Sequence, residues 1–356
     1  MNKIKQLSFE GQTIFCGIDV HKKSWRVNIR SDQFELEDYS QDPCEITLLR
    51  HLRKNYPGAN YQVAYEAGFS GFSTQRFLEK SGLNCIIVNP ADVPCSDKDK
   101  RRKNDIIDAR KISRELSNRK LEGIYVPVPE MEHARTLVRQ RDRLVQDQTR
   151  CKNRIWHLLM FSGVKLNANK PEHPWSRRFI ETLRQTPCET ETLRYTLDTA
   201  IEEYLQVRKI LSQATKQIRK LSQQMSFVTI QKLLRSIPGI GIVNAMTIMT
   251  ELQDMRRFRT FDNLCSYAGI VPDMASSGDN EKLRGITNRS NAYLRPALVE
   301  SSWTIVRKDP AMLMLYKKYC AKMVPNKAII KIAKHLLSRI RYVWVNQIEY
   351  EIGIVG

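Results

Sequence analysis

Four carboxylates in the first third of the chain have a spacing that suits a metal site. Asp19 ends the apolar run TIFCGIDV, and Glu66 ends a second run, YQVAYE. Asp105 and Asp108 are three residues apart in KNDIIDARK, which places them on one face of a helical turn. Mg²⁺ prefers oxygen ligands, and two-metal phosphoryl chemistry needs carboxylates around ions about 4 Å apart. The four residues are therefore candidate ligands of a Mg²⁺ pair, with Mn²⁺ as the alternative ion.

Each acid also has an ordinary structural explanation. A strand-end aspartate commonly caps a turn, and an Asp105–Asp108 pair would stabilise a helix N-terminus through the helix dipole. The stretch CGIDVHKKS also resembles the phosphate-binding hairpin of actin-like ATPases and sugar kinases. However, the sequence lacks their second Asp-Gly-rich hairpin and their Gly-rich adenosine site. The order of strand, strand and helix, with the basic run KDKRRK before the helical pair, favours the metal interpretation.

A serine forms a second candidate site, within YAGIVPDMASSGDNEKLRGITNRSNAYLRPAL. Ser276 and Ser277 are adjacent and precede Gly278, so either hydroxyl is a candidate nucleophile. Such Ser-Ser-Gly stretches are most often plain loops. Attack on a phosphodiester would need an activated hydroxyl and groups that stabilise the phosphate. Nearby side chains that are candidates to stabilise the phosphate are Arg284, Arg289, Asn291 and Arg295. Because no histidine is near, a Ser-His-Asp hydrolase is not supported, and a metal ion would have to assist.

The composition indicates the class of partner. The 356 residues include 58 lysines and arginines against 38 acids, a net charge of +20, and 42% are hydrophobic. Such a chain is long enough for two or three domains, and its positive field favours nucleic acid. It has no apolar run of membrane-spanning length, no signal-peptide pattern and no CxxC pair among its eight cysteines. We expect a cytoplasmic protein without a membrane partner, a zinc site or disulfides.

The fold class expected is α/β plus all-α. Residues 1–125 are predicted to form a mixed α/β domain that positions the carboxylates. The expected strands are TIFCGIDV, SWRVNIRS, YQVAYEAG and NCIIVNP, and the expected helices are ITLLRHLRKNY, GFSTQRFLEKSG and DIIDARKISREL. Alternating strands and helices indicate a central sheet covered by helices.

Residues 126–232 are predicted to be a long helical, coiled-coil region. In a helix over 131–160, apolar residues recur at seven-residue steps; they are Leu137, Leu144, Cys151 and Leu158. No glycine or proline occurs from Glu189 to Ile237, where apolar residues alternate in steps of four and three. These seam residues are Leu193, Leu197, Ala200, Tyr204, Val207, Leu211, Ala214, Ile218, Leu221, Met225 and Val228. The pattern predicts a second unbroken helix that pairs with the first, with a second subunit, or with both.

Residues 233–356 are predicted to be a mostly helical domain. The turn in SIPGIGIV resembles a helix-hairpin-helix element, whose glycines let the backbone approach a phosphate. A later helix has Lys327, Lys331 and Lys334 beside an apolar face, which is predicted to consist of Ile329, Ile330, Ala333, Leu336 and Leu337. Over the whole chain, the residues expected to contact nucleic acid are Lys22, Lys23, Arg101, Arg102, Lys103, Arg135, Arg139, Arg143, Arg150, Arg154, Gly239, Gly241, Arg284, Arg289 and Arg295.

The ordered set of motifs resembles a known family. The motifs are GIDVHK, YEAG, KNDIIDARK, IPGIG, RFRTFDNLCSYAGIVP, SSG and GITNRSNAYLRPAL, and they extend over nearly the full chain. They are similar to the insertion-sequence transposases that combine a RuvC-like DEDD domain with a serine-bearing transposase domain. These enzymes are relatives of the Piv/MooV invertases and are also called bridge-RNA-guided recombinases. The sequence departs from the family pattern GITK-x-GN at Asn288 and Ser290.

The resemblance implies a specific chemistry. The first domain would have an RNase-H-like fold with Asp19, Glu66, Asp105 and Asp108 as its DEDD ligands. Ser277 would form a covalent phosphoserine link to DNA. The partners would be donor and target double-stranded DNA, a structured non-coding guide RNA and further copies of the chain, as a dimer or tetramer. The protein would be prokaryotic and associated with the nucleoid.

Two alternatives remain open at this stage. One is a DEDD nuclease of the junction-resolving kind, in which Mg²⁺ activates water and Ser277 is only part of a turn. The other is a non-enzymatic protein that binds nucleic acid through its basic helices.

Overall fold

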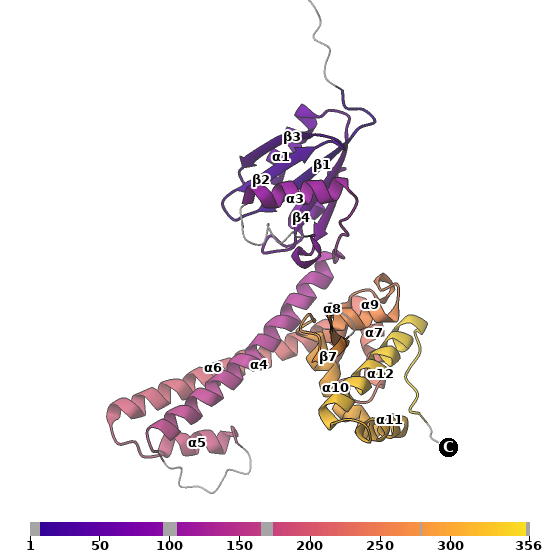
Figure 1. The fold of residues 1–356 in the computed structure, drawn as a ribbon. Coiled ribbons are helices and arrows are strands. Elements are labelled where there is room, and N and C mark those ends of the chain that lie inside the picture. The colour runs from indigo at the N-terminus through magenta and orange to yellow at the C-terminus, as the bar shows by residue number, and fades with distance from the viewer. Residues whose placement is uncertain (1–7, 95–104, 165–173, 278–279, 354–356) are drawn as a thin grey trace, which may run out of the picture. The chain divides into compact units, whose positions relative to one another are not determined.

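The computed structural model describes residues 8–94, 105–164, 174–277 and 280–353. Within these ranges, side chains are described except at residues 105–107, 273–277 and 280–284. The chain divides into two compact units, Met1–Val126 and Pro127–Gly356 (Figure 1), and each is described by itself. The protein is mixed α/β, with a five-stranded sheet in the first unit and mostly helices in the second.

The first unit contains a mixed sheet with the strand order β3-β2-β1-β4-β5. β1, β2 and β3 are antiparallel neighbours, whereas β4 and β5 run parallel to β1. Its elements are β1 (Thr13–Val20), β2 (Trp25–Arg30), β3 (Glu35–Gln41), α1 (Glu45–Asn55), β4 (Asn60–Glu66), α2 (Ser73–Lys80), β5 (Asn84–Val88), the 3-10 turn η1 (Pro90–Asp92) and α3 (Asp105–Ser117). The four strands and three helices expected from the sequence are confirmed.

Helices cover both faces of this sheet because the side chains of β1 alternate between them. Ile14 and Ile18 lie on one face in a cluster with Leu52 of α1. Phe15 lies on the other face, in a cluster with Ile112 of α3. The strand is therefore buried on both sides, which explains why its sequence is almost continuously apolar.

The edge strand β3 is not predicted by the sequence analysis. Its sequence, ELEDYSQ, contains three acids and no clear apolar alternation. These acids have internal partners: Glu37 accepts a hydrogen bond from the Tyr56 hydroxyl at 2.8 Å, and Asp38 forms ion pairs with Arg26 and Arg110. Charged residues are common on edge strands, where they discourage pairing with another chain. Because they also interrupt the apolar alternation typical of a strand, the sequence pattern does not predict β3.

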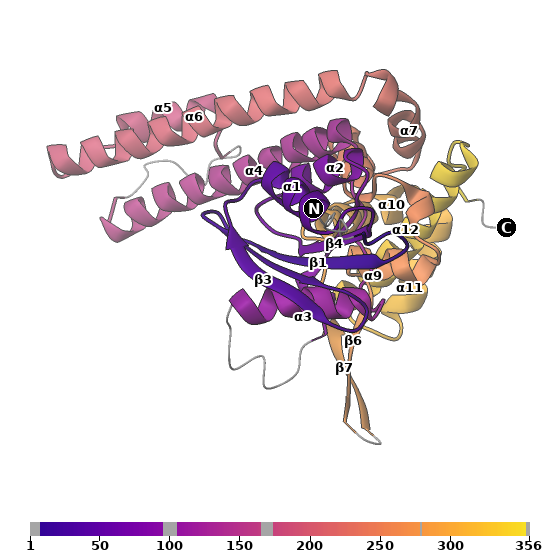
Figure 2. The same cartoon turned by 90° about the horizontal axis from the view of Figure 1, so that it is seen from above.

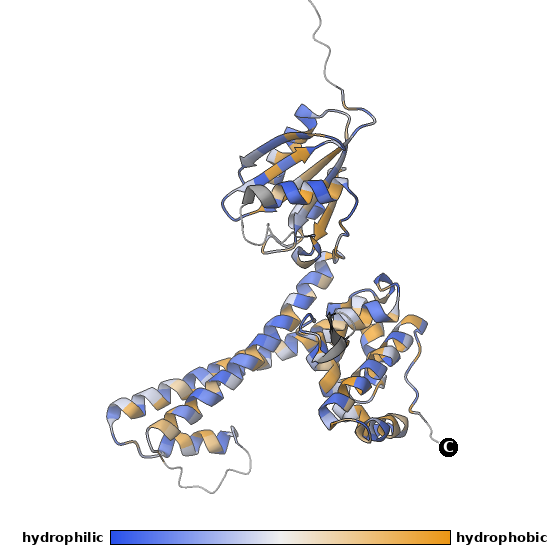
Figure 3. Ribbon diagram, viewed as in Figure 1, coloured by the Kyte–Doolittle hydropathy of each residue, from blue (hydrophilic) through white to orange (hydrophobic). Residues whose placement is uncertain are grey.

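A long helical hairpin forms one part of the second unit. It consists of α4 (Pro129–Phe161) and α6 (Glu191–Leu221), which pack along each other, with α5 (Arg177–Gln185) beside them (Figure 1). The predicted helix over 131–160 is confirmed. At one end of the hairpin, Cys151 and Ile155 of α4 pack with Leu197, Ile201 and Tyr204 of α6. Hydrophobic and hydrophilic residues alternate along both helices, as expected for a two-helix seam (Figure 3).

The prediction of one unbroken helix from Glu189 to Ile237 is wrong. α6 ends at Leu221, and a separate helix α7 begins at Met225. At the break, the Ser222 hydroxyl donates a hydrogen bond to the Arg219 carbonyl at 2.7 Å, a local contact that competes with helix propagation. Met225, which continues the heptad pattern, is 91% exposed, whereas Phe227 is fully buried. The seam therefore stops at Leu221.

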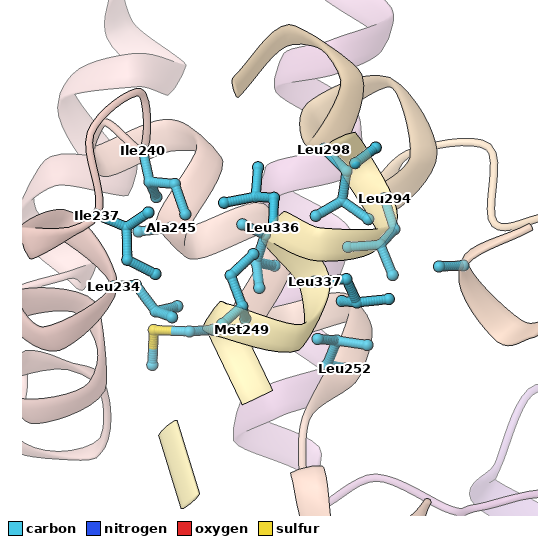
Figure 4. Close-up of a cluster of buried hydrophobic side chains, with 14 of the residues drawn as sticks. Leu234, Ile237, Ile240, Ala245, Met249, Leu252, Leu294, Leu298, Leu336 and Leu337 are labelled. Atoms are coloured by element: carbon cyan, nitrogen blue, oxygen red, sulfur yellow. The ribbon is translucent and has the colours of Figure 1, made fainter. Parts of the chain in front are cut away.

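The rest of the second unit is a helical domain with one small hairpin. Its elements are α7 (Met225–Ser236), α8 (Ile242–Leu252), the 3-10 turn η3 (Met255–Arg257), α9 (Phe261–Ala268), β6 (Pro272–Ser277), β7 (Asn280–Ile286), α10 (Leu294–Lys308), α11 (Pro310–Cys320) and α12 (Pro325–Asn346). Its core joins Leu234 of α7, Met249 of α8, Leu298 of α10 and Leu336 of α12 (Figure 4). The first turns of α4 enter the same core, so α4 contributes to both ends of the unit.

Candidate metal site and nucleic-acid interface

Asp19 and Glu66 lie side by side at the carboxyl end of two neighbouring parallel strands. The last paired residues of β1 and β4 are Ile18 and Tyr65, so the next position on each strand is one of the two acids. Both belong to the face that α3 covers, because they alternate with Ile18 and Tyr65, which belong to the opposite core. The two predicted strand-end acids therefore share one edge and one face of the sheet.

α3 lies against this face because of a glycine. A Cβ atom at Gly17 would lie only 2.4 Å from the Ala109 carbonyl oxygen and 2.4 Å from the Ser113 amide nitrogen. Further along the helix, Ile112 packs with Phe15, on the side of Gly17 away from Asp19. The N-terminal turn of α3 is thus directed toward the strand end that carries Asp19. This turn contains Asp105, the side chain of which lies outside the described residues, and Asp108.

Polar contacts fix α3 to the outer strands. The Ser113 hydroxyl donates to the side-chain oxygen Oδ1 of Asn28 at 2.5 Å, in a fully buried position. Arg110 forms ion pairs with Asp38 at 2.6 Å and with Glu35 at 3.0 Å. These contacts hold the helix at a fixed rotation, which determines where its N-terminal acids lie.

The described carboxylates do not assemble a metal cage by themselves. Among the side chains that the structure describes, no group of three or more His, Cys, Asp or Glu is close enough to hold a metal ion. Asp19 is instead 3.0 Å from Nε2 of His21. The geometry brings two strand-end acids and the start of α3 to one sheet edge, but the acids with described side chains, Asp19, Glu66 and Asp108, do not form one coordination sphere. The residue types suit a hard divalent cation, because all are oxygen donors.

The basic residues near this edge are only partly described. Lys22 and Lys23 are exposed in the turn between β1 and β2, where their ammonium groups are accessible to a polyanion. Arg101, Arg102 and Lys103 lie outside the described residues.

The arginines of α4 do not form one uniform surface stripe. Arg139 makes two hydrogen bonds of 2.7 Å to the fully buried carboxylate of Glu251, and these bonds raise its pKa. Arg135 is half-buried, and its pKa is lowered by burial and by the nearby charge of Arg139. Arg143 is exposed. The last two predicted arginines are also exposed and form ion pairs, Arg150 with Asp147 at 2.7 Å and Arg154 with Glu203 at 2.6 Å.

The predicted serine lies at the end of a β-strand and not in an irregular loop. β6 and β7 pair antiparallel, with Ser276 opposite Glu281 and Ser277 opposite Asn280. Ser277 therefore occupies the tip of a two-stranded hairpin that projects from the helices of its unit (Figure 2). The side chains of Ser276, Ser277 and Arg284 lie outside the described residues.

Arg295 and Asn291 fix the base of this hairpin. Nη1 of Arg295 donates to the carbonyl of Gly269 at 3.2 Å and to that of Thr287 at 2.7 Å, so one guanidinium joins the chain before β6 to the chain after β7. The side-chain nitrogen Nδ2 of Asn291 donates to Glu251 at 2.7 Å, and its side-chain oxygen Oδ1 accepts from two backbone amides at the start of α10. Arg289, the third described candidate, is exposed.

The departure from the family turn pattern has a local structural role. Gly269 has a φ of +71°, and a Cβ atom there would lie 2.1 Å from Cβ of Ser290. The turn that contains Ser290 therefore packs directly on Gly269, whereas Asn288 is exposed.

The glycines of the helix-hairpin-helix-like turn differ in their surroundings. Gly239 has a φ of +96°, and a Cβ atom there would lie 2.6 Å from the Ser301 carbonyl oxygen of α10. Packing against α10 is thus sufficient to explain this glycine. Gly241 directly precedes α8, and no atom lies within 4 Å of an added Cβ, so its backbone is accessible.

Two family models match the chain over these regions. A model described as transposase, for the DEDD domain of the IS110 type, matches residues 16–162, which include the strand-end acids and α3. A model described as the transposase IS116/IS110/IS902 family matches residues 231–317, which include the serine hairpin. The chain is a transposase of the IS110/IS116 family.

Relatives of this transposase support the assignment. A putative transposase, y4qE, of Sinorhizobium fredii is 28% identical over 298 residues, which are 82% of this chain and 71% of the relative. The transposase for insertion sequence element IS1533 of Leptospira borgpetersenii is 25% identical, over 68% of this chain and 70% of the relative. The predictions of an enzyme and of a transposase are therefore confirmed. None of the described helices is both long and apolar enough to cross a bilayer.

Sequence reasoning missed the buried carboxylate of this transposase. Glu251 has no exposed surface and binds Arg139, Asn291 and, through its carbonyl, the Tyr267 hydroxyl at 3.0 Å. A signal was present, because Glu251 is the single acid at the end of the apolar helix IVNAMTIMTEL. A lone charge on a buried helix is expected to have a dedicated partner.

Proposed function

We propose that this transposase cuts and joins DNA strands with divalent metal ions held by the carboxylates of its first unit. One observation carries the proposal: Asp19 and Glu66 end adjacent parallel strands on the face toward which the start of α3, with Asp105 and Asp108, is directed. The strand order β3-β2-β1-β4-β5, in which β1, β2 and β3 are antiparallel and β4 and β5 run parallel to β1, fits the RNase-H-like fold that the family resemblance implies.

The residues of the chain would divide the work as follows. When bound, Mg²⁺ would polarise the scissile phosphate and lower the pKa of the attacking hydroxyl. Asp19, Glu66, Asp105 and Asp108 would hold the ions, and Gly17 would set the distance between the strand and helix that carry them. The exposed ammonium groups of Lys22 and Lys23 would bind neighbouring backbone phosphates.

Substitution of one ligand tests this proposal. Asp19→Asn keeps the volume of the side chain but removes its charge, and Asp32→Asn in the exposed turn between β2 and β3 is the matched control. The assay follows excision and insertion of a plasmid-borne element with its flanking DNA intact, together with DNA binding in EDTA. We expect Asp19→Asn to lower recombination roughly a hundredfold or more with unchanged binding. Wild-type activity in Asp19→Asn would refute the metal proposal.

Two nucleophiles are proposed for this reaction, a metal-activated water and a serine hydroxyl. The DEDD domain match favours hydrolysis by activated water. The position of Ser277 at a hairpin tip, with the hairpin base fixed by Arg295, favours direct attack by its hydroxyl and a covalent phosphoserine link. In that step the serine oxygen bonds to phosphorus, its proton passes to a base, and the deoxyribose oxygen leaves.

Denaturing gels distinguish the two mechanisms. Serine attack predicts a labelled protein–DNA adduct that survives denaturation, disappears in Ser277→Ala and persists in Ser276→Ala. Hydrolysis predicts free DNA ends and no adduct in wild type. If the adduct is lost in Ser276→Ala alone, the neighbouring serine is the nucleophile.

Two further proposals concern partners. A structured guide RNA would choose the donor and target DNA, and several copies of the chain would assemble, with the hairpin of α4 and α6 as a contact surface. Deletion of the non-coding DNA that flanks the gene, with the ends of the element retained, should abolish recombination, and supplying that RNA in trans should restore it. Sedimentation of the DNA-bound protein measures the number of copies.

A further inference from the structure

A groove of about 510 Å³ lies between the base of the serine hairpin and α12. One wall is formed by Val271, Pro272 and Ile286, where the hairpin leaves the helical domain. The other wall is formed by the first three turns of α12, including Ile330. Its volume is within the range of sites that bind small organic groups.

The apolar wall of this groove differs from the sequence expectation. The sequence analysis places Ile330 on the buried face of its helix, together with Ile329 and Ala333. The structure buries Ile329 and Ala333, but Ile330 is only partly covered and lines the groove. An apolar side chain therefore faces a cavity that is open to solvent.

The rim of the groove is basic. Lys327, Lys331 and Lys334 follow one another at one-turn spacing on α12, and all three line the groove. α12 contains no acidic residue. Within the described part of the chain, Lys334 forms an ion pair with Asp262 of α9, at 3.5 Å. An apolar slot with a positive rim matches a nucleotide, which has a flat apolar base and a charged phosphate.

We propose that this groove holds one unstacked nucleobase of the DNA strand, while Lys327 and Lys331 bind the phosphates on either side. The base would lie between the hairpin wall and Ile330. Because the hairpin wall continues directly into β6 and β7, a base held here would fix the position of the adjoining phosphate relative to the hairpin. The choice of DNA as occupant rests on the proposed function.

The test compares DNA with and without bases. The probes are a fluorescein-labelled dodecamer of thymidine and the same sugar–phosphate dodecamer without bases, and anisotropy of the full-length protein is measured in EDTA. EDTA makes the result independent of metal-ion catalysis, so failure here is distinguishable from failure of the proposed function. We expect wild type to bind the base-bearing DNA about tenfold more tightly than the abasic DNA.

Substitutions locate the effect. Ile330→Asp should remove most of the tenfold ratio, and Met323→Glu on the groove lining serves as a second variant if the first does not fold. Val345→Asp, at a 52% exposed position of the same helix, is the matched control and should keep the ratio. Lys331→Ala should weaken binding of both DNAs by the same factor, because it removes only a phosphate contact.

Several results would overturn the proposal. Equal affinity of wild type for both DNAs would exclude a base site. A ratio that persists in Ile330→Asp and Met323→Glu would place the base elsewhere. A base-dependent ratio seen only with an RNA dodecamer would replace DNA with RNA as the occupant. A change of sedimentation in Ile330→Asp with an unchanged ratio would make the groove a contact between copies of the chain.

Discussion

Substitution of Gly17 by alanine should separate the strand and helix that carry the candidate metal ligands. The added methyl carbon would lie 2.4 Å from the Ala109 carbonyl oxygen and from the Ser113 amide nitrogen, and 3.0 Å from the Ser113 Cα. All three are backbone atoms of α3, so no side-chain rotation relieves the overlap. Ordinary contact requires about 3.5 Å, and α3 must therefore move away from β1 by about 1 Å.

The displacement has two measurable consequences. Overpacking of this kind costs about 1–3 kcal/mol of unfolding free energy. A shift of about 1 Å also exceeds the tolerance of about 0.5 Å for a catalytic constellation, so recombination should fall about a hundredfold. Activity should therefore fall more than the loss of folded protein explains.

The assay combines urea denaturation with plasmid recombination. Gly68→Ala, two residues beyond Glu66, is the matched control, because an added Cβ there meets no atom within 4 Å. The control should retain both stability and activity. The reasoning fails if Gly17→Ala is as active as Gly68→Ala, or if its activity falls only in proportion to its folded fraction.

Three further predictions follow from contacts in the second unit. Arg139→Met leaves the carboxylate of Glu251 buried without the guanidinium that pairs with it. Urea denaturation should show that the free energy of unfolding falls by about 3 kcal/mol, and adding Glu251→Leu should restore part of it. Arg295→Ala should loosen the hairpin base, so that hydrogen exchange of the amide of residue 287 becomes about tenfold faster while α8 amides are unchanged. The pKa of His335 is lowered by burial and by the positive charges of Arg339, Lys334 and Lys331. The unfolded state therefore binds the proton more readily, and the unfolding free energy should be highest above about pH 6.5 and decrease as the pH falls below that value. His335→Gln should make the unfolding free energy less dependent on pH in this range, whereas His157→Gln on α4 should leave the pH dependence unchanged.

The strands and helices that could be predicted from sequence are those with a clear local pattern. β1 is buried on both faces, and its almost continuous apolar run identifies it directly. Helix α4 has an uninterrupted heptad and no internal proline, so its predicted and observed bounds agree within two residues. These elements are determined by residues close together in the chain.

The elements that were missed depend on distant partners. β3 is an acidic edge strand that is held by Arg26, Arg110 and Tyr56 from other elements. After the break at Leu221, Phe227 is buried in the core of the helical domain while the heptad position Met225 is exposed, a change of buried face that the local heptad does not reveal.

The residues of the candidate sites also separate into those that a local sequence pattern identifies and those that depend on distant contacts. The acids were found from their types and from the strand ends, and the register of β1 with β4 places Asp19 next to Glu66. The Arg139–Glu251 contact joins residues 112 positions apart, so a stripe of arginines on α4 could not be sorted into internal and accessible members. The β-strand that carries Ser277 was missed because its polar composition is typical of a loop.

Because α4 packs into a core at each of its ends, the length of the helical hairpin determines how these two groups of buried side chains are rotated relative to each other. α4 enters the core of the helical domain through Ala134 and Val138 and a second core through Ile155 and Leu159. One added residue would turn the second group by about 100° relative to the first, so that it faces solvent. Insertions of seven residues in both helices would nearly restore the phase. During evolution, the hairpin is thus expected to lengthen or shorten in steps that nearly restore this phase, such as roughly seven or eleven residues, and any variant of intermediate length must rebuild one of its two cores.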